Sequence, residues 1–207
     1  MHTKYSKYSG MMRRCVMTLL LASVSFFGSQ MLAAAQQTSN GLSSGGAGEG
    51  WRARLHQSMP LLGHRNWILV VDSAYPLQTS PGVETIETDG SEVEVVREVL
   101  QEVDQSIHVR PIVFMDAELP FVTEDDAPGV EQYRREIRSV LGDRPVSSIL
   151  HEAMLSKIDE AGKTFHVLVL KTRLAVPYTS VFFQLDCKYW SADAEARLRK
   201  AMKSQAH

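Results

Sequence analysis

Apolar residues along this chain gather in short runs separated by segments of helical period. Trp67–Val71 (WILVV) is a continuous run of branched and aromatic residues, which is typical of a strand buried on both faces of a central sheet. Similar runs predict strands at Arg110–Met115, Thr164–Leu170 and Val181–Leu185, and Val83–Ile86 is predicted as a further strand. Only a short segment separates the last two strands, which favours at least one antiparallel pair.

Between these runs, apolar residues recur three or four positions apart, as on the buried face of a helix. The predicted helices are Trp51–Met59, ended by Pro60; a helix capped by Ser91 that runs to Val103; Gly129–Leu141; Ser148–Ala161, ended by Gly162; and a polar C-terminal helix at 191–204. Strands and helices alternate along most of the chain. The pattern therefore predicts an α/β domain with a central mixed sheet flanked by helices.

The N-terminal residues have a different pattern. Residues 1–14 carry four basic residues and no acidic one, Cys15–Phe27 is an apolar run, and Ala33-Ala34-Ala35 follows. A basic stretch, a short apolar core and an A-x-A site are typical of a secretory signal peptide, and we predict one at 1–35. An uncleaved N-terminal anchor is the alternative. Residues 36–50 are rich in Gly and Ser and are predicted to form a flexible linker, so that the folded domain is 51–207.

Charge and cysteine content narrow the possible partners. The chain has 22 basic and 24 acidic residues; without residues 1–35 it has 18 and 24, a net charge of −6. This charge argues against nucleic acid, which needs a basic face, and against an anionic membrane surface once the signal is cleaved. Cys187 is then the only cysteine, which excludes an intrachain disulfide. No C-x-x-C or H-E-x-x-H spacing indicates a metal site.

Two ionisable residues flank the first predicted core strand. His64 follows a glycine just before the strand, on a segment that rigid structure would position. Asp72 follows the strand directly, where it is partly desolvated unless it is paired. A catalytic or binding pair and a pair of turn residues both fit this spacing.

The order of motifs resembles the RbsD/FucU family of D-ribose pyranases and L-fucose mutarotases, with the fucose-type branch closer. Residues 63–76 (GHRNWILVVDSAYP) resemble its opening signature, with the aspartate eight residues after the histidine. Residues 83–90 (VETIETDG), 113–115 (VFM) and 130–134 (VEQYR) resemble later segments in the same order. Tyr178-Thr179-Ser180 falls where the family has Tyr-x-Asn. The resemblance covers about residues 54–188.

The resemblance implies an aldose ring isomerase that uses no metal and no other cofactor. It implies a monosaccharide substrate, fucose-like or ribose-like, and a homo-oligomeric ring, often a decamer, with sites between neighbouring subunits. It assigns acid/base catalysis to His64 and substrate binding to Asp72. It assigns further substrate contacts to Tyr178, Thr179 and Ser180.

Three departures from the family pattern bear on these assignments. Ser180 replaces the family's asparagine and loses a donor. The family has a basic residue 22 positions before the tyrosine, where this chain has Ser156, or Met154 if the intervening loop is two residues longer. His151 is the nearest histidine and fits only with a further insertion; we keep it as a candidate substrate-binding residue. The predicted export is the third departure, because familiar members are cytoplasmic.

A distance argument separates the two main candidates. Eight residues of strand span up to about 26 Å, at about 3.3 Å per residue, which is far longer than a monosaccharide. His64 and Asp72 therefore contact one sugar only if a loop folds back or if two subunits meet. Two other functions remain open: a non-catalytic carbohydrate-binding or sensing domain on the same fold, and a structural exported oligomer without a sugar ligand.

Overall fold

The computed structural model describes residues 47–205. The predicted signal peptide at 1–35 lies outside these residues, as does most of the predicted linker at 36–50. The last four linker residues instead begin the first helix, α1 (Ala47–Ser58). Trp51 and Leu55 fix this helix because both are buried in the core, and the helix extends one turn back from them. The first described helix thus starts four residues before the predicted domain boundary.

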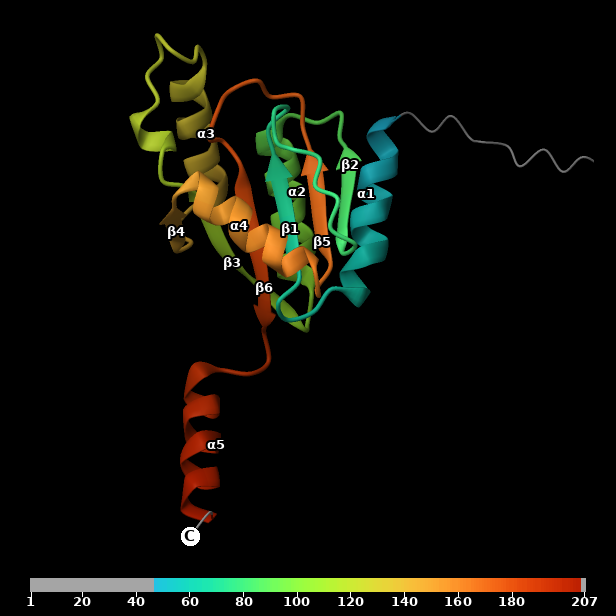
Figure 1. Cartoon of the computed structure of the whole chain (residues 1–207), viewed down its shortest axis with the longest axis vertical. Helices are drawn as coiled ribbons and strands as arrows, with labels where there is room; N and C mark the ends of the chain where they lie inside the picture. Colours follow the sequence, from blue (N-terminus) through green and yellow to red (C-terminus); the bar gives the residue numbers. More distant parts are fainter. Residues whose placement is uncertain (1–46, 206–207) are drawn as a thin grey trace, which may run out of the picture. The chain divides into compact units, whose positions relative to one another are not determined.

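Six strands form one mixed sheet in the order β2–β5–β1–β6–β3–β4 (Figure 1). Their bounds are β1 Trp67–Val71, β2 Val83–Glu87, β3 Val109–Asp116, β4 Val146–Ile149, β5 Val167–Lys171 and β6 Val181–Cys187. β6 is antiparallel to both of its neighbours, β1 and β3. The other pairs, β1 with β5, β2 with β5 and β3 with β4, are parallel. Five strands therefore run one way and β6 runs the other, which confirms the predicted α/β fold with a mixed sheet.

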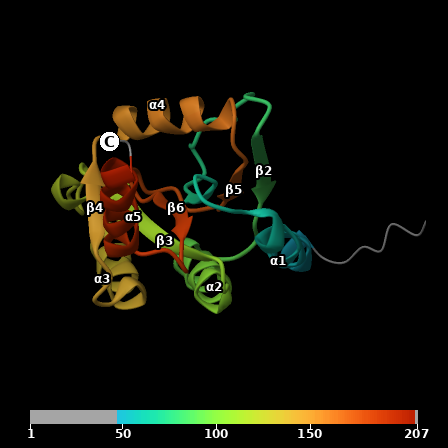
Figure 2. The same cartoon turned by 90° about the horizontal axis from the view of Figure 1, so that it is seen from below.

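Helices lie on both faces of the sheet (Figure 2). The remaining helices are α2 Glu92–Gln105, α3 Val130–Leu141, α4 His151–Gly162 and α5 Ala192–Gln205, with 3₁₀ turns at Met59–Leu61 (η1) and Leu119–Phe121 (η2). Helices α1, α2 and α3 contribute to the core on one face, and α4 contributes to the core on the other. Within the described residues, no helix combines the length and apolarity that a membrane span requires.

β1 is the centre of both cores. All five of its residues are buried, and they alternate between the two faces: Ile68 and Val70 pack with α1, α2 and α3, whereas Leu69 packs with α4. This alternation follows from the period of two along a strand. The predicted strand buried on both faces is confirmed.

The start of α2 also agrees with the sequence. Ser91 is the N-cap, and its hydroxyl accepts a hydrogen bond from the Glu94 backbone N–H. The Glu94 carboxylate accepts from the Ser91 backbone N–H in return, which completes a capping box. This cap places Glu92 in the first turn of α2, where the site described below needs it.

Two predicted elements differ in the structure. The helix predicted from Ser148 is preceded by a short strand, β4, and α4 begins only at His151. β4 has four residues at the edge of the sheet and is mostly exposed, so it carries no apolar period that would distinguish it from a helix start. β5 and β6 follow one another in the chain but are not neighbours, because β1 lies between them. The antiparallel pairs are those that β6 makes with β1 and β3.

Gly82 lies where two backbone segments approach closely. Its N–H donates to the Gly162 carbonyl, and its carbonyl accepts from the Val167 N–H, both at 2.9 Å. A Cβ at this position would lie 2.2 Å from the Phe165 carbonyl oxygen and 2.7 Å from that of Gly162. Only glycine fits between these backbones without a shift.

We expect Gly82→Ala to lower the free energy of unfolding by about 1–3 kcal/mol, the usual cost of overpacking. Urea unfolding followed by circular dichroism would measure the loss. Gly50→Ala is the matched control, because a Cβ there meets no atom within 4 Å. Equal midpoints for Gly82→Ala and the unmodified chain would contradict the prediction.

Candidate functional site

The candidate residues lie at the two opposite ends of the strands, and we call each of these two sides of the sheet an edge. The carboxyl ends of β1, β3, β4 and β5 meet the amino end of β6 at one edge, which we call the Asp72 edge; it carries Asp72, Asp116, His151, Tyr178 and Ser180. The opposite edge, called here the His64 edge, carries the amino ends of β1 and β3 and the carboxyl end of β6. Its ionisable residues include His64, Arg65, Arg110 and Asp186.

Asp72 is held at the end of β1 by two hydrogen bonds. Its Oδ1 accepts from the Ala74 backbone N–H at 2.7 Å, and its Oδ2 lies 3.5 Å from the Ser180 Oγ. Asp72 is 7% exposed and Ser180 is fully buried. The structure thus brings together Asp72 and the residue that replaces the family's asparagine.

His151 lies at the same edge and pairs with a carboxylate that the sequence did not single out. Its Nδ1 is 3.0 Å from Asp116 Oδ2, and its ring meets the Tyr178 ring edge-on, with centroids 5.5 Å apart. Glu118 accepts two contacts from the His151 backbone N–H at the start of α4. These contacts place His151, a candidate on weak spacing alone, beside Tyr178.

Asp116 is buried, and one of its oxygens lacks a partner. Its side chain is 0% exposed, and Oδ1 makes no hydrogen bond within the described residues. Burial raises the pKa of Asp116 to about 6, although the hydrogen bond and the charge of His151 oppose this rise. A buried oxygen without a partner is costly, and this oxygen has no access to solvent in the structure.

A second buried carboxyl, Glu92, lies beneath the Tyr178–Ser180 turn. Three hydroxyls converge on it: Tyr133 at 3.1 Å, Thr172 at 3.2 Å and Thr179 at 3.4 Å. Each hydroxyl has a backbone carbonyl closer than this. Tyr133 lies 2.5 Å from the Thr179 carbonyl, and the two threonines each lie 3.0 Å from another carbonyl.

The protonation state of Glu92 depends on how many hydroxyl hydrogens are available to its carboxyl group. Each hydroxyl has one hydrogen to donate, and a nearer carbonyl competes with Glu92 for it. An ionised Glu92 would then be buried with few donors, whereas the protonated acid can itself donate to the Tyr133 oxygen. Burial accordingly raises the pKa of Glu92 to about 8; the Tyr133 hydrogen bond opposes the rise, and the charge of Asp72 adds to it. The Thr179 hydroxyl belongs to this network and holds the turn.

His64 forms a similar pair at the opposite edge. Its Nδ1 lies 3.1 Å from Asp186 Oδ1, and its side chain is 56% exposed. Arg110 donates two hydrogen bonds to Asp186 Oδ2, at 3.0 and 2.7 Å. Burial would raise the pKa of Asp186, but the hydrogen bonds from Arg110 and the Cys187 backbone lower it below its ordinary value. Asp186 therefore stays ionised beside the imidazole.

An open cavity of about 600 Å³ adjoins His64. Arg65, Arg110 and Asp186 line it from the sheet, and Trp190 and Glu195 line it from the C-terminal segment. Its size is within the range of small-molecule sites. A histidine, an ionised carboxylate and an indole around one cavity are suited to binding a small polar ligand.

Backbone strain occurs at both edges. Among the described residues, Arg65 (φ 75°) and Tyr178 (φ 60°) are the non-glycine residues with a left-handed backbone. Such a conformation costs an L-residue of order 1 kcal/mol and is concentrated at functional sites. One strained residue follows His64, and the other carries the predicted substrate-contacting phenol. Strain thus coincides with both halves of the predicted site.

The structure brings five of the six predicted site residues to one edge and leaves the sixth at the other. Asp72, His151, Tyr178, Thr179 and Ser180 share the Asp72 edge, while His64 lies beyond the five residues of β1, which span about 16 Å. Sequence reasoning missed Asp116, Glu92 and Asp186. Asp116 carries the same signal as Asp72, an acid directly after a buried run; Asp186 lies within a strand and carries no such signal.

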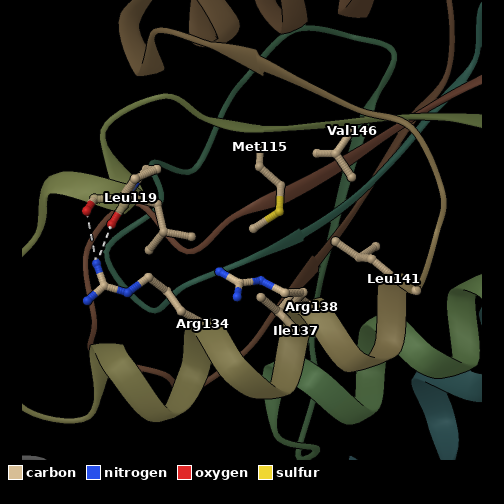
Figure 3. Close-up of a pocket in the computed structure, with 9 residues that line it drawn as sticks. Met115, Leu119, Arg134, Ile137, Arg138, Leu141 and Val146 are labelled. Atoms are coloured by element: carbon tan, nitrogen blue, oxygen red, sulfur yellow. Dashed lines mark hydrogen bonds between the residues drawn. The ribbon is translucent and has the colours of Figure 1, made fainter.

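A second cavity, of about 240 Å³, lies between α3 and the β3–β4 margin of the sheet (Figure 3). Its walls are mostly apolar, with Met115, Ile137 and Val146 among them. Arg134 at its rim donates to the carbonyls of Leu119, Pro120 and Val122. These bonds hold the Arg134 Nη1, and Arg138 is the other charged residue of the lining. Because no carboxylate or imidazole lines the walls, this cavity is a poor candidate for acid/base catalysis.

Comparison with known proteins gives structural neighbours only. No model of a known protein family matches the chain, and no curated protein sequence matches it. RbsD of Bacillus subtilis in complex with D-ribose is similar at 14% identity and a TM-score of 0.47, over 65% of this chain and 92% of that one. FucU from Bifidobacterium longum is 17% identical, with a TM-score of 0.42 over 65% and 94% of the two chains.

The fucose mutarotase of Streptococcus pneumoniae in complex with L-fucose is 20% identical, with a TM-score of 0.42 over 63% of this chain and 89% of that one. The three neighbours are thus an RbsD protein in complex with D-ribose, a FucU protein, and a fucose mutarotase in complex with L-fucose. Similarity at this level leaves the activity of this chain to be argued from its own residues.

The buried Glu92 predicts a specific dependence of stability on pH. Its pKa is 4.5 when exposed and about 8 when folded, so between these values the folded chain holds a proton that the unfolded chain releases. This contribution to stability is therefore lost as pH rises through this window and changes little above it.

We expect Glu92→Gln, which keeps the shape without the charge, to flatten this decline in urea unfolding measured at several pH values across the window. Glu152→Gln, an exposed acid in the first turn of α4, is the control and should leave the profile unchanged. Parallel profiles for Glu92→Gln and the unmodified chain would show that Glu92 is not the titrating group.

Proposed function

We propose that this protein is an exported monosaccharide mutarotase or pyranase, which interconverts anomers or ring forms of a free fucose-like or ribose-like sugar. The carrying observation is the presence of two histidine–aspartate pairs, His64–Asp186 and His151–Asp116, at opposite edges of one sheet. In each pair Nδ1 faces the carboxylate, and Nε2 makes no hydrogen bond within the described residues. The residue resemblance supports the same assignment.

The reaction needs two proton transfers. A base removes the proton of the anomeric hydroxyl, an acid protonates the ring oxygen, and the bond between the anomeric carbon and the ring oxygen breaks to give an open aldehyde. After rotation about the adjacent carbon–carbon bond, the same steps in reverse close the other form. Imidazole suits both transfers because its ordinary pKa lies near neutrality. A carboxylate on Nδ1 fixes the ring and its tautomer, as in other histidine-dependent sites.

Two copies of the chain supply one site in this proposal. A sugar that contacts His64 cannot reach the Asp72 edge of the same copy, because β1 lies between them. If the His64 edge of one copy meets the Asp72 edge of another, His64 and His151 become the two proton-transfer groups on either side of one sugar. The homo-oligomer implied by the resemblance provides this arrangement.

The remaining residues bind and orient the sugar. Each Asp72 oxygen accepts one hydrogen bond within the protein and has a further lone pair for a sugar hydroxyl. Tyr178 is 37% exposed and presents a ring or hydroxyl to the sugar from its strained turn. Thr179 supports this turn through Glu92.

One observation favours the alternative of a binding or sensing domain without catalysis. The Ser180 hydroxyl is fully buried and faces Asp72, so the donor of the family's asparagine is not replaced at the surface of the site. A domain of this kind would bind the sugar at the Asp72 edge without accelerating its exchange. Activity measurements on the same protein separate the two functions.

We expect His64→Ala to lower the rate of anomer exchange at least about 100-fold, the lower range for removing a general acid or base. Saturation-transfer NMR on D-ribose and L-fucose would measure the exchange. His56→Ala is the control, because His56 is an exposed histidine paired with Glu102. Binding of a sugar without faster exchange in the unmodified protein would select the sensing domain, and an unchanged rate in His64→Ala would remove His64 from the mechanism.

Mixing two inactive variants tests the shared site. His64→Ala impairs one edge and Asp72→Asn the other, so copies of both variants that assemble together form some intact interfaces. We expect exchange activity to return after the two variants are unfolded together and refolded, but not when each is refolded alone. A mixture as inactive as its components would place both residues in one copy's site or in none.

A further inference from the structure

The C-terminal helix α5 lies outside the stretch of the resemblance, and no residue of it is buried. Leu198 and Met202 are 42% and 54% exposed and lie one turn apart on the same side. An isolated helix of this length is marginal in water. Without apolar burial, α5 lacks the packing that stabilises the other helices of the fold, and its apolar side is available to a partner.

The start of α5 lies beside His64, and its own side chains hold one another there. Trp190 Nε1 donates to the Glu195 carboxylate at 2.8 Å, and Glu195 pairs with Arg199 at 2.6 Å. Trp190, Glu195 and Arg199 all line the His64 cavity. Leu198 and Met202 border the helix side that carries Glu195 and Arg199, since residues three and four apart are neighbours on a helix. Whatever covers them therefore adjoins the His64 cavity.

Two exposed apolar side chains lie at the opposite edge of the sheet, and together we call them the Phe121–Leu150 patch. Phe121 is 82% exposed and Leu150 is 63% exposed; Phe121 ends the η2 turn after β3, and Leu150 immediately precedes His151. Arg134 donates to three carbonyls of segment 119–122. Phe121 is thus held in the exposed position by a clamped backbone, as expected of an anchor residue in an interface.

The two surfaces carry opposite charges. α5 has four basic and two acidic residues, and within the described residues Arg197, Lys200 and Lys203 make no ion pair. Phe121 is followed by Glu124, Asp125 and Asp126, which likewise have no ion pair there. On the helix, Arg197 and Lys203 flank the side that carries Leu198 and Met202, whereas Lys200 lies on the opposite side. Pairing of the two flanking residues with the acidic segment would give the interface specificity and register.

We infer that α5 is an intersubunit clamp, which docks Leu198 and Met202 on the Phe121–Leu150 patch of a second copy of this chain. The helix extends from the His64 edge of one copy, and the patch borders the Asp72 edge of the next. The clamp therefore brings together the two edges that the proposed function requires, and its orientation rests on that proposal. A 14-residue helix spans about 21 Å, enough to lie along such an edge.

Substitutions on the apolar side of α5 test the clamp through oligomeric state. Leu198→Gln with Met202→Gln removes the apolar side chains, keeps the charge and retains good helix formers. We expect this variant of the full chain to dissociate at protein concentrations where the unmodified chain is oligomeric, as measured by light scattering after size exclusion. Ala196→Gln on the other side of the helix is the matched control and should assemble normally.

Cross-linking tests the identity of the docking surface. In a chain with Cys15→Ser and Cys187→Ser, copies carrying Met202→Cys are mixed with copies carrying Phe121→Cys and oxidised. We expect a disulfide-linked pair of the two kinds of copy, and little product when Ala196→Cys replaces Met202→Cys.

Three results would overturn the clamp: a monomeric unmodified chain, an oligomer unaffected by Leu198→Gln with Met202→Gln, or α5-dependent binding to anionic lipid vesicles by a chain that stays monomeric. The light-scattering and cross-linking measurements use no sugar, so they are independent of the exchange assay. If cross-linking succeeds while the exchange assay fails, the clamp stands and the proposed catalysis fails; the reverse result retains catalysis and removes the clamp.

Discussion

The backbone hydrogen bonds that hold β6 between β1 and β3 organise both edges of the sheet. β6 pairs with β1 from Trp67 opposite Gln184 to Val70 opposite Val181, and with β3 along its whole length. Because β6 runs against both neighbours, its first residues follow Ser180 at the edge where β1 delivers Asp72. Its last residues deliver Asp186 to the edge where His64 precedes β1. One antiparallel strand therefore supplies a partner to the key residue at each end.

The buried carboxyl groups differ in how the cost of burying their charge is offset. Asp186 stays ionised because Arg110 donates two hydrogen bonds to it. Asp116 is paired with His151 but keeps one oxygen without a partner, and its pKa rises to about 6. Glu92 has only hydroxyl neighbours, whose hydrogens have nearer acceptors, and is accommodated by staying protonated. The cost of burying a charge thus separates structural carboxyls from those that can act on a ligand.

The sequence was sufficient to predict the strands with strong apolar runs and the capped helix α2, because period and capping are local signals. It could not predict β4, whose four mostly exposed residues carry no period. Nor could it predict the position of β1 between β5 and β6, which depends on pairing across about 100 residues. Asp72 was a candidate from its position directly after β1, whereas Tyr178–Ser180 came from motif order alone. Asp186 was missed because its significance arises only when β6 returns beside His64.

The position of β1 also affects how the chain folds. This strand is made early, yet both of its partners lie far along the chain: Trp67 is opposite Val167 in β5 and Gln184 in β6. Contacts of such high sequence separation form slowly because a long loop must close first. During synthesis, the most apolar strand of the protein therefore has no sheet to join until nearly the whole chain has been made. A chain cut short before β6 lacks the middle of its sheet rather than its margin.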